Sequence, residues 1–204
     1  MRDDRKTDRQ DQIQQAAYAL LEEKGFAGTT MQGIAQRARA SNQTLYAWYG
    51  NKLGLFRALV AQNADQLRNL LAPCIADGGD PIQTLAQLGP RLIEVLTHPR
   101  AIALNRTAAA DPTGDLGRVI GEAGRDTIGP LIRQVLERAR DQGALRFRDS
   151  QAALVLYMDL LIGDLQHQRV IGRIAPPSPD WCQARAALAL ARLQKLLDGA
   201  ADLA

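Results

Sequence analysis

The chain has 204 residues, of which 46% are hydrophobic, so it is long and apolar enough to bury a core and is not expected to be disordered. Its 25 Lys and Arg against 22 Asp and Glu give a formal charge of +3, which permits a polyanionic partner without requiring one. Two distant cysteines, two histidines, a polar start and no apolar run of about 18 residues predict a soluble cytoplasmic protein without a disulfide framework, metal site, cofactor or membrane helix.

The first predicted helix carries one apolar stripe with the spacing i, i+3, i+4, i+7 and i+8. The stripe consists of Ile13, Ala16, Ala17, Leu20 and Leu21. Gly25 fits the left-handed position that follows a helix, and Phe26 is placed to pack back on Leu21. We therefore expect the helix to stop at Gly25.

Two short helices should follow. The stretch "TTMQGIAQRA" offers Thr29 or Thr30 as the N-cap, with Thr29 and Gln32 at the spacing of a capping box. A few residues later Ser41 can cap a third helix, whose apolar positions are Leu45, Trp48 and Tyr49. A helix, a short turn and a second short helix form the helix-turn-helix pattern, in which the second helix lies in the major groove of DNA.

The rest of the chain is predicted to be helical with longer elements, which we place at 53–72, 81–97, 99–110, 115–141, 150–171 and 180–198. Asp80-Pro81 gives an N-cap followed by proline at the first helical position, "DPTG" at 111–114 reads as a turn, and "RIAPPSPD" at 173–180 reads as a loop. Several glycines and Pro130 should make the 115–141 segment irregular or split it. The fold class is therefore all-α.

The segment 152–165 is apolar nearly all round, so both of its faces must be covered. It is either the central helix of a monomeric bundle or a helix shared between a core and a dimer interface. A palindromic DNA site requires a two-fold protein, which favours the second reading. On that reading the candidate interface residues are Leu160, Leu161, Leu190, Leu193 and Leu197.

The stretch "TTMQGIAQRARASNQTLYAWYGNKLGLF", residues 29–56, resembles the DNA-binding domain of the TetR family of transcriptional regulators. The resemblance implies a helix-turn-helix domain over 1–52 and a helical effector-binding and dimerisation domain over 53–204. Two positions depart from the family pattern. Arg39 stands where glycine is usual, which means either that the turn differs or that Arg39 is kept for phosphate contact, and Ala47 can offer a base only its methyl group.

Base reading is assigned to the first turn of the third helix, where Asn42 and Gln43 can hydrogen-bond adenine. Phosphate contact is assigned to the flanks, to Tyr46 and to Lys52, while Trp48 suits packing and phosphate contact equally. The arm adds Arg2, Arg5, Lys6 and Arg9, most of which are expected to be solvated. The full set of candidate DNA contacts is Thr29, Thr30, Gln32, Arg39, Ser41, Asn42, Gln43, Thr44, Tyr46, Ala47, Trp48 and Lys52.

The resemblance further implies a homodimer that binds a double-stranded DNA operator and responds to a small, largely apolar effector. Repression is the expected direction, although some relatives activate. The candidate pocket residues are Asn63, Gln66, Arg106, Tyr157 and Asp159, for each of which a surface position is at least as plausible. Two other functions compete with this one: an enzyme or carrier, for which no catalytic constellation is visible, and a non-specific architectural DNA binder, which should be more basic.

Overall fold

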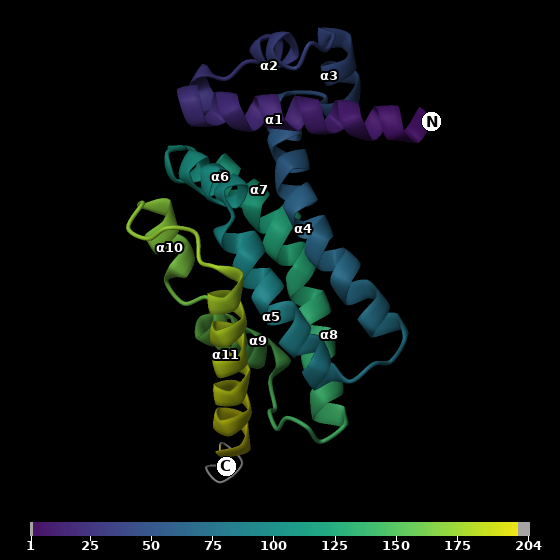
Figure 1. Cartoon of the computed structure of the whole chain (residues 1–204), viewed down its shortest axis with the longest axis vertical. Coiled ribbons are helices and arrows are strands. Elements are labelled where there is room, and N and C mark those ends of the chain that lie inside the picture. Colours follow the sequence, from purple (N-terminus) through teal and green to yellow (C-terminus); the bar gives the residue numbers. More distant parts are fainter. Residues whose placement is uncertain (1, 200–204) are drawn as a thin grey trace. The chain divides into compact units, whose positions relative to one another are not determined.

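The computed structural model describes the backbone of residues 2–199 and the side chains of residues 6–197. Within that part the chain is helical and contains no strand, which confirms the all-α prediction (Figure 1). The elements are α1 Arg2–Gly28, α2 Met31–Arg37, α3 Asn42–Tyr49, α4 Lys52–Ala76, α5 Pro81–Thr97, α6 Pro99–Ala109, α7 Asp115–Ile120, the π-helix η1 Gly121–Arg125, α8 Asp126–Asp141, α9 Ser150–Leu161, α10 Leu165–Val170 and α11 Pro179–Gly199. None of the described helices is long and apolar enough to cross a membrane.

Glycines interrupt the helices at three places. Gly25 has φ 65° inside α1, where the sequence predicted the first helix to stop. The predicted 115–141 helix is split by the π-helical turn η1, as its glycines suggested. The predicted 150–171 helix is divided at Gly163, whose φ of 50° breaks the helical course between α9 and α10. A residue with a side chain would be strained at that φ, so glycine is favoured at this break. A glycine within an apolar helical pattern is the sequence signal for such a break.

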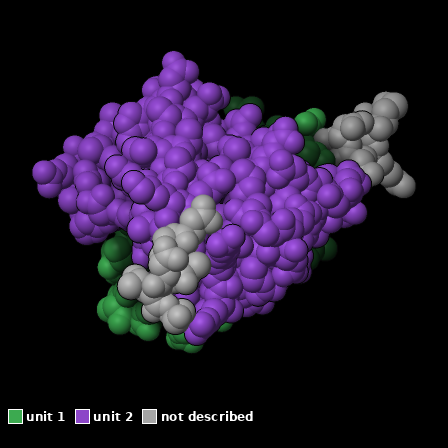
Figure 2. Space-filling model, turned by 90° about the horizontal axis from the view of Figure 1, so that it is seen from below, with its two compact units in different colours: residues 1–62, 103–123 green, residues 63–102, 124–204 purple. Residues whose placement is uncertain are grey.

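The described chain packs as two compact units, which Figure 2 distinguishes by colour. Unit 1 runs through Gln62 and includes Ala103–Ala123. Its core joins the apolar stripe of α1 to α2, α3, the start of α4 and the α6–α7 region, and its fully buried side chains include Ile13, Ile34, Leu45 and Leu59. The short helices of the helix-turn-helix are therefore held by a core of their own, which a two-turn helix needs because it is unstable in isolation.

Unit 2 comprises Asn63–Ile102 and the described residues from Gly124 onward. Helices α5, α8, α9 and α11 pack side by side around a core that contains Leu88, Leu92, Leu136 and Leu193. Three chain segments pass from one unit to the other, within α4, within α6 and at η1. These units are divisions by packing, and the functional division at residues 52 and 53 stays a prediction.

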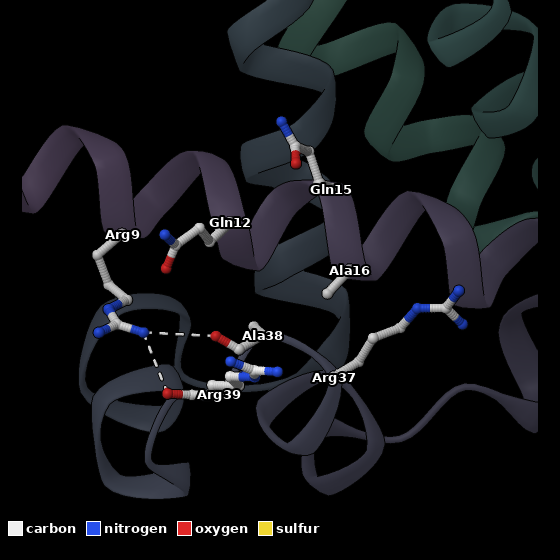
Figure 3. Close-up of a pocket in the computed structure, with 7 residues that line it drawn as sticks. All are labelled: Arg9, Gln12, Gln15, Ala16, Arg37, Ala38 and Arg39. Carbon is white, nitrogen blue, oxygen red and sulfur yellow. Dashed lines mark hydrogen bonds between the residues drawn. The ribbon is translucent and has the colours of Figure 1, made fainter.

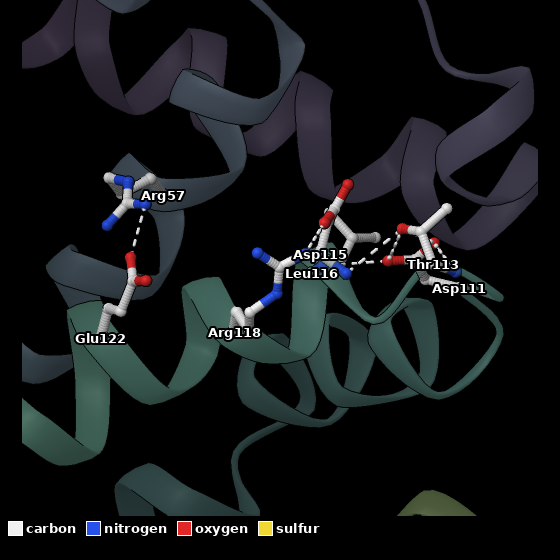
Figure 4. A network of polar contacts seen from close by, with 7 residues as sticks. All are labelled: Arg57, Asp111, Thr113, Asp115, Leu116, Arg118 and Glu122. Atoms are coloured by element: carbon white, nitrogen blue, oxygen red, sulfur yellow. Dashed lines mark hydrogen bonds and ion pairs between the residues drawn. The ribbon is translucent and has the colours of Figure 1, made fainter.

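The turn before α7 is built on one carboxylate (Figure 4). Asp111 accepts hydrogen bonds from the backbone N–H of Leu116 at 2.9 Å, from the Thr113 hydroxyl at 2.8 Å and from the Thr113 N–H at 3.1 Å. These bonds stabilise the charged form and lower the pKa of Asp111. The same unit contains an ion pair between Arg57 of α4 and Glu122 of η1, at 2.7 Å. The predicted turn at 111–114 is thus a helix-start motif.

Candidate DNA-binding surface

Helix α2 begins at a side-chain cap. The hydroxyl of Thr30 accepts a hydrogen bond from the N–H of Gly33 at 3.0 Å. Of the two candidate N-caps, Thr29 and Thr30, the cap is therefore Thr30. Thr29 is 2% exposed, and its hydroxyl donates to the carbonyl of Gly25 at 2.7 Å. The side chain of Thr29 therefore secures the α1–α2 junction and is removed from the set of proposed DNA contacts, while Thr30 and Gln32 are exposed.

The turn between α2 and α3 keeps the left-handed geometry that usually requires glycine. Arg39 has φ 51°, and the next N–H, that of Ala40, bonds to the carbonyl of Ala35 at 2.9 Å. The guanidinium of Arg9 on α1 donates to the carbonyls of Arg39 at 3.1 Å and Ala38 at 3.4 Å (Figure 3). The turn therefore has a left-handed residue at position 39, and a cation from α1 donates to the carbonyl of that residue.

Helix α3 has a polar, exposed first turn and packs into the core of unit 1 through Leu45. The hydroxyl of Ser41 accepts from the N–H of Thr44 at 3.0 Å and lies 2.8 Å from the Thr44 hydroxyl, which confirms the predicted cap. Leu45 is fully buried, whereas Asn42 and Gln43 are exposed. The amide side chains thus stand on a helix end whose free N–H groups and positive dipole favour an anionic partner.

The last turn of α3 carries exposed aromatic side chains. Tyr46 is 54% exposed and Trp48 is 36% exposed, while Ala47 is exposed beside them. The Trp48 ring meets Tyr49 edge-on with ring centroids 6.4 Å apart. Burial, and secondarily the charge of Asp11, raises the pKa of Tyr49, as expected for the core position predicted for it. Trp48 packs against Tyr49 and is also exposed to solvent.

The start of α4 is fixed by three local features. The Asn51 side chain accepts from the N–H of Gly54 at 2.8 Å and caps the helix. A Cβ at Gly54 would lie 2.0 Å from the carbonyl oxygen of Tyr49, so only glycine fits this close approach. The ammonium of Lys52 donates to the carbonyl of Phe26 at 2.6 Å and lies 4.2 Å above the Phe26 ring. Burial lowers the pKa of Lys52. Lys52 therefore has a structural role beside any contact with phosphate.

The basic residues at the start of α1 have different surroundings. The side chains of Arg2 and Arg5 lie outside the described residues, and Lys6 is exposed. Most of the arm's charges are expected to be solvated, but Arg9 donates to the carbonyls of Ala38 and Arg39, about thirty residues further along the chain. Sequence reasoning also missed Gly54 and the Asn51 cap. An asparagine three residues before Gly54 was a readable N-cap signal, whereas nothing local indicated the role of Arg9.

The candidate effector-pocket residues do not come together in the interior. Gln66, Arg106 and Asp159 are exposed, and Arg106 belongs to unit 1 whereas the others belong to unit 2. Tyr157 is 1% exposed, donates its hydroxyl to the carbonyl of Leu85 at 3.3 Å, and has a pKa raised by burial. Tyr157 is thus a satisfied core residue, and of the five only Asn63 is a partly buried polar residue. In the described part of the chain, no three His, Cys, Asp or Glu side chains are grouped as metal ligands.

Four of the five candidate dimer leucines are buried in the core of unit 2. Leu161, Leu190, Leu193 and Leu197 are at most 8% exposed and belong to the core of unit 2, while Leu160 is partly buried. The opposite side of the same two helices is exposed and carries apolar side chains among polar ones, which include Asp159, Arg192 and Lys195. It carries Val155 on α9 and Trp181, Leu188 and Leu196 on α11, each between 42% and 51% exposed. We call these four residues the α9–α11 apolar face.

Comparisons with known proteins agree with this geometry. Residues 13–59 match the family described as bacterial regulatory proteins, tetR family, and residues 83–192 match the C-terminal domain of AefR-like transcriptional repressors. The chain is 34% identical over 160 residues to YvkB, an uncharacterised HTH-type transcriptional regulator of Bacillus subtilis (strain 168). The matched region covers 78% of this chain and 82% of YvkB.

Solved structures share the fold. A TetR transcriptional regulator from Agrobacterium tumefaciens superimposes with a TM-score of 0.71 at 28% identity, over 92% of this chain and 93% of its own. The flavonoid-responsive regulator FrrA gives a TM-score of 0.67 at 24% identity, over 93% of this chain and 97% of its own. With the capped helix-turn-helix and the matches to both parts of the chain, the conclusion is that this protein belongs to the TetR family of transcriptional regulators and carries a helix-turn-helix DNA-binding domain.

Proposed function

We propose that the protein is a repressor that binds a palindromic operator as a homodimer, in the cytoplasm, and is released by a small-molecule effector. The observation that carries the DNA-binding part is the first turn of α3, where exposed Asn42 and Gln43 stand on a capped helix end anchored by buried Leu45. Amide side chains can bond adenine in a bidentate way in the major groove, which gives sequence preference without requiring charge. The flanking residues Thr30, Gln32, Tyr46 and Lys52 are proposed to contact phosphates.

The dimer is supported by the α9–α11 apolar face. Four large apolar side chains are exposed on two helices that pack against each other, and an isologous contact would cover those of each copy with the same residues of the other. Two recognition helices related by a two-fold axis then require a palindromic site.

The effector is proposed to act through α4. This helix supplies Phe56 and Leu59 to one core and Leu67 and Leu71 to the other, so a change in its position alters the packing of both sets of residues. An effector shifts DNA affinity only to the extent that it binds one conformation better, typically by about 1–3 kcal/mol. The proposed ligand is a small, largely apolar molecule bound among the helices of unit 2, whose core is apolar.

The base-reading role is tested by selecting a preferred duplex from a random library with the wild-type protein and measuring Gln43→Ala on it. Loss of an amide that bonds a base should cost about 1–3 kcal/mol per contact and relax preference at one symmetric pair of positions. Binding to random duplex and the salt dependence should hardly change, because no phosphate contact is lost. Gln87→Ala, which removes an exposed glutamine of α5, is the matched control.

Two results would count against this assignment. Equal loss of affinity by Gln43→Ala on every sequence would place Gln43 on the backbone of DNA. Failure of the wild-type protein to enrich any duplex would remove the regulatory function itself. The effector is sought separately, with apolar small molecules that raise the thermal midpoint and then reduce affinity for the selected duplex.

A further inference from the structure

A recess of about 560 Å³ opens on the surface of unit 1, between α1 and the α2–α3 turn (Figure 3). The described residues that line it are Arg9, Gln12, Gln15, Ala16, Arg37, Ala38 and Arg39. Three of these side chains are guanidinium groups, two are amides and none is a carboxylate. The polar part of the lining is therefore rich in hydrogen-bond donors and positive charge, which suits a phosphate.

The three arginines differ in how far they are already engaged. Arg37 forms an exposed ion pair with Glu23 at 2.6 Å, so its charge is largely compensated. Arg9 uses one terminal nitrogen on the carbonyls of Ala38 and Arg39 and keeps its other donors. The guanidinium of Arg39 has no ion-pair or hydrogen-bond partner among the described residues and is exposed. Arg39 is therefore the cation most available to a ligand.

The backbone of Arg39 gives an independent reason to assign it a function. Its φ of 51° lies in the left-handed region that glycine adopts without strain and a long side chain does not. Such outliers persist where the surrounding structure enforces them, and they cluster at functional sites. Here Arg9 enforces the turn, and the strained residue carries its cation to the recess that Arg9 also lines.

We propose that this recess binds one phosphate of the DNA backbone beside the major-groove site, with Arg39 as the principal contact and Arg9 and the Gln12 amide as additional donors. The inference rests on the proposed DNA-binding function and extends it to a phosphate outside the recognition helix. A guanidinium fork matches two phosphate oxygens, which explains an arginine rather than a lysine at a strained position. Asp8 and Asp11 lie on the same helix but do not line the recess.

The decisive variant is Arg39→Gly, because it removes the cation and relieves the strain at the same time. Its thermal midpoint should therefore rise or stay unchanged while its affinity for DNA falls, so that lost binding cannot be attributed to a damaged fold. The slope of log affinity against log salt should decrease by about 0.9 for each subunit bound. Affinity should fall on the selected duplex and on random duplex alike, because a phosphate contact carries no base preference.

Two companion variants make the result specific. Arg39→Lys keeps a cation and the strain and should retain the wild-type salt slope. Arg148→Ala removes an exposed arginine of unit 2 and should leave the slope unchanged, which controls for net charge. Inorganic phosphate is added at constant ionic strength in a separate thermal scan to test a small-anion site.

The outcomes separate this inference from the proposed function. If the wild-type protein prefers one duplex and Arg39→Gly keeps the wild-type salt slope, the recess does not bind DNA although the regulatory function stands. The same holds if inorganic phosphate stabilises the wild-type protein but not Arg39→Gly while the DNA slope is unaltered, because the recess is then a site for a small anion. If the wild-type protein prefers no sequence, the proposed function fails, and the slopes on random duplex still decide the role of Arg39.

Discussion

Arg39 adopts a left-handed backbone conformation that a distant residue stabilises. A positive φ at an arginine costs about 1 kcal/mol or more relative to glycine, so the sequence alone leaves two readings, an altered turn or a retained function. The structure decides the shape, because Arg39 has φ 51° and its carbonyl is held by Arg9. Arg9 lies 30 residues away in the sequence. Local pattern cannot reveal such a contact, since only the fold brings the two residues together.

Lys52 is the second residue whose role changes with its surroundings. We expect Lys52→Met to lower the free energy of unfolding by about 1–2 kcal/mol, because it removes a charged hydrogen bond to the Phe26 carbonyl and a cation–π contact of about 0.5–1 kcal/mol. Urea unfolding measures this effect. The carbonyl keeps a second partner, the N–H of Thr29 at 3.2 Å, which limits the loss.

The same variant should weaken binding to specific and random DNA alike if the remaining donors of Lys52 meet a phosphate. Lys24→Met, an exposed lysine on α1, is the matched control for stability. A Lys52→Met protein as stable as the wild type would show that the bond to Phe26 contributes nothing in solution. A loss confined to the preferred duplex would show that Lys52 reads bases.

At the scale of elements, the sequence predicts what depends on neighbours in the chain. The caps at Ser41 and Asp80 were readable because the side chain and the N–H that it accepts from are two or three residues apart. The sequence does not predict which side of a helix the protomer buries itself, because the period of 152–165 shows two apolar sides without saying which one faces the core. Leu161 and Leu193 face the core, and Val155 and Leu188 are exposed.

The contact between α5 and α11 depends on one glycine. A Cβ on Gly89 would lie 2.8 Å from the Cβ of Ala186 and 3.3 Å from the hydroxyl of Tyr157, so the two helices approach closely at this point. Gly89→Ala should gain about 1 kcal/mol in helix propensity and lose about 1–3 kcal/mol to overpacking. We expect a net loss of stability in thermal or urea unfolding.

Gly117→Ala is the matched control, because nothing lies within 4 Å of the added methyl group in α7. That variant should be stabilised by up to about 1 kcal/mol. If Gly89→Ala were stabilised to the same extent, α11 would not pack against α5 as closely as described.

At the scale of the whole molecule, the described chain forms two compact units, each with its own core, and the chain passes between them within α4, within α6 and at η1. The family membership is carried by both parts, since separate matches cover 13–59 and 83–192. The sequence does not identify the proposed effector or its pocket, because apolar side chains that line a cavity and apolar side chains that fill a core have the same composition and period.

The proposed dimer gives the last prediction. Leu188→Asp places a charge on the α9–α11 apolar face without entering the core, because Leu188 is 45% exposed. By two-fold symmetry the change occurs twice per interface, and each buried leucine contributes about 1.5–3 kcal/mol, so the dimer should weaken by about 3 kcal/mol or more, roughly 100-fold. Sedimentation should then show a folded monomer, and the preferred duplex should bind no better than random DNA.

Ile171→Asp, on an apolar residue that is 58% exposed and lies outside α9 and α11, should leave the dimer intact. Leu193→Ala, in the core, should instead lower the free energy of unfolding by about 2–5 kcal/mol. A Leu188→Asp protein that remains dimeric and binds its duplex normally would move the subunit contact to another surface.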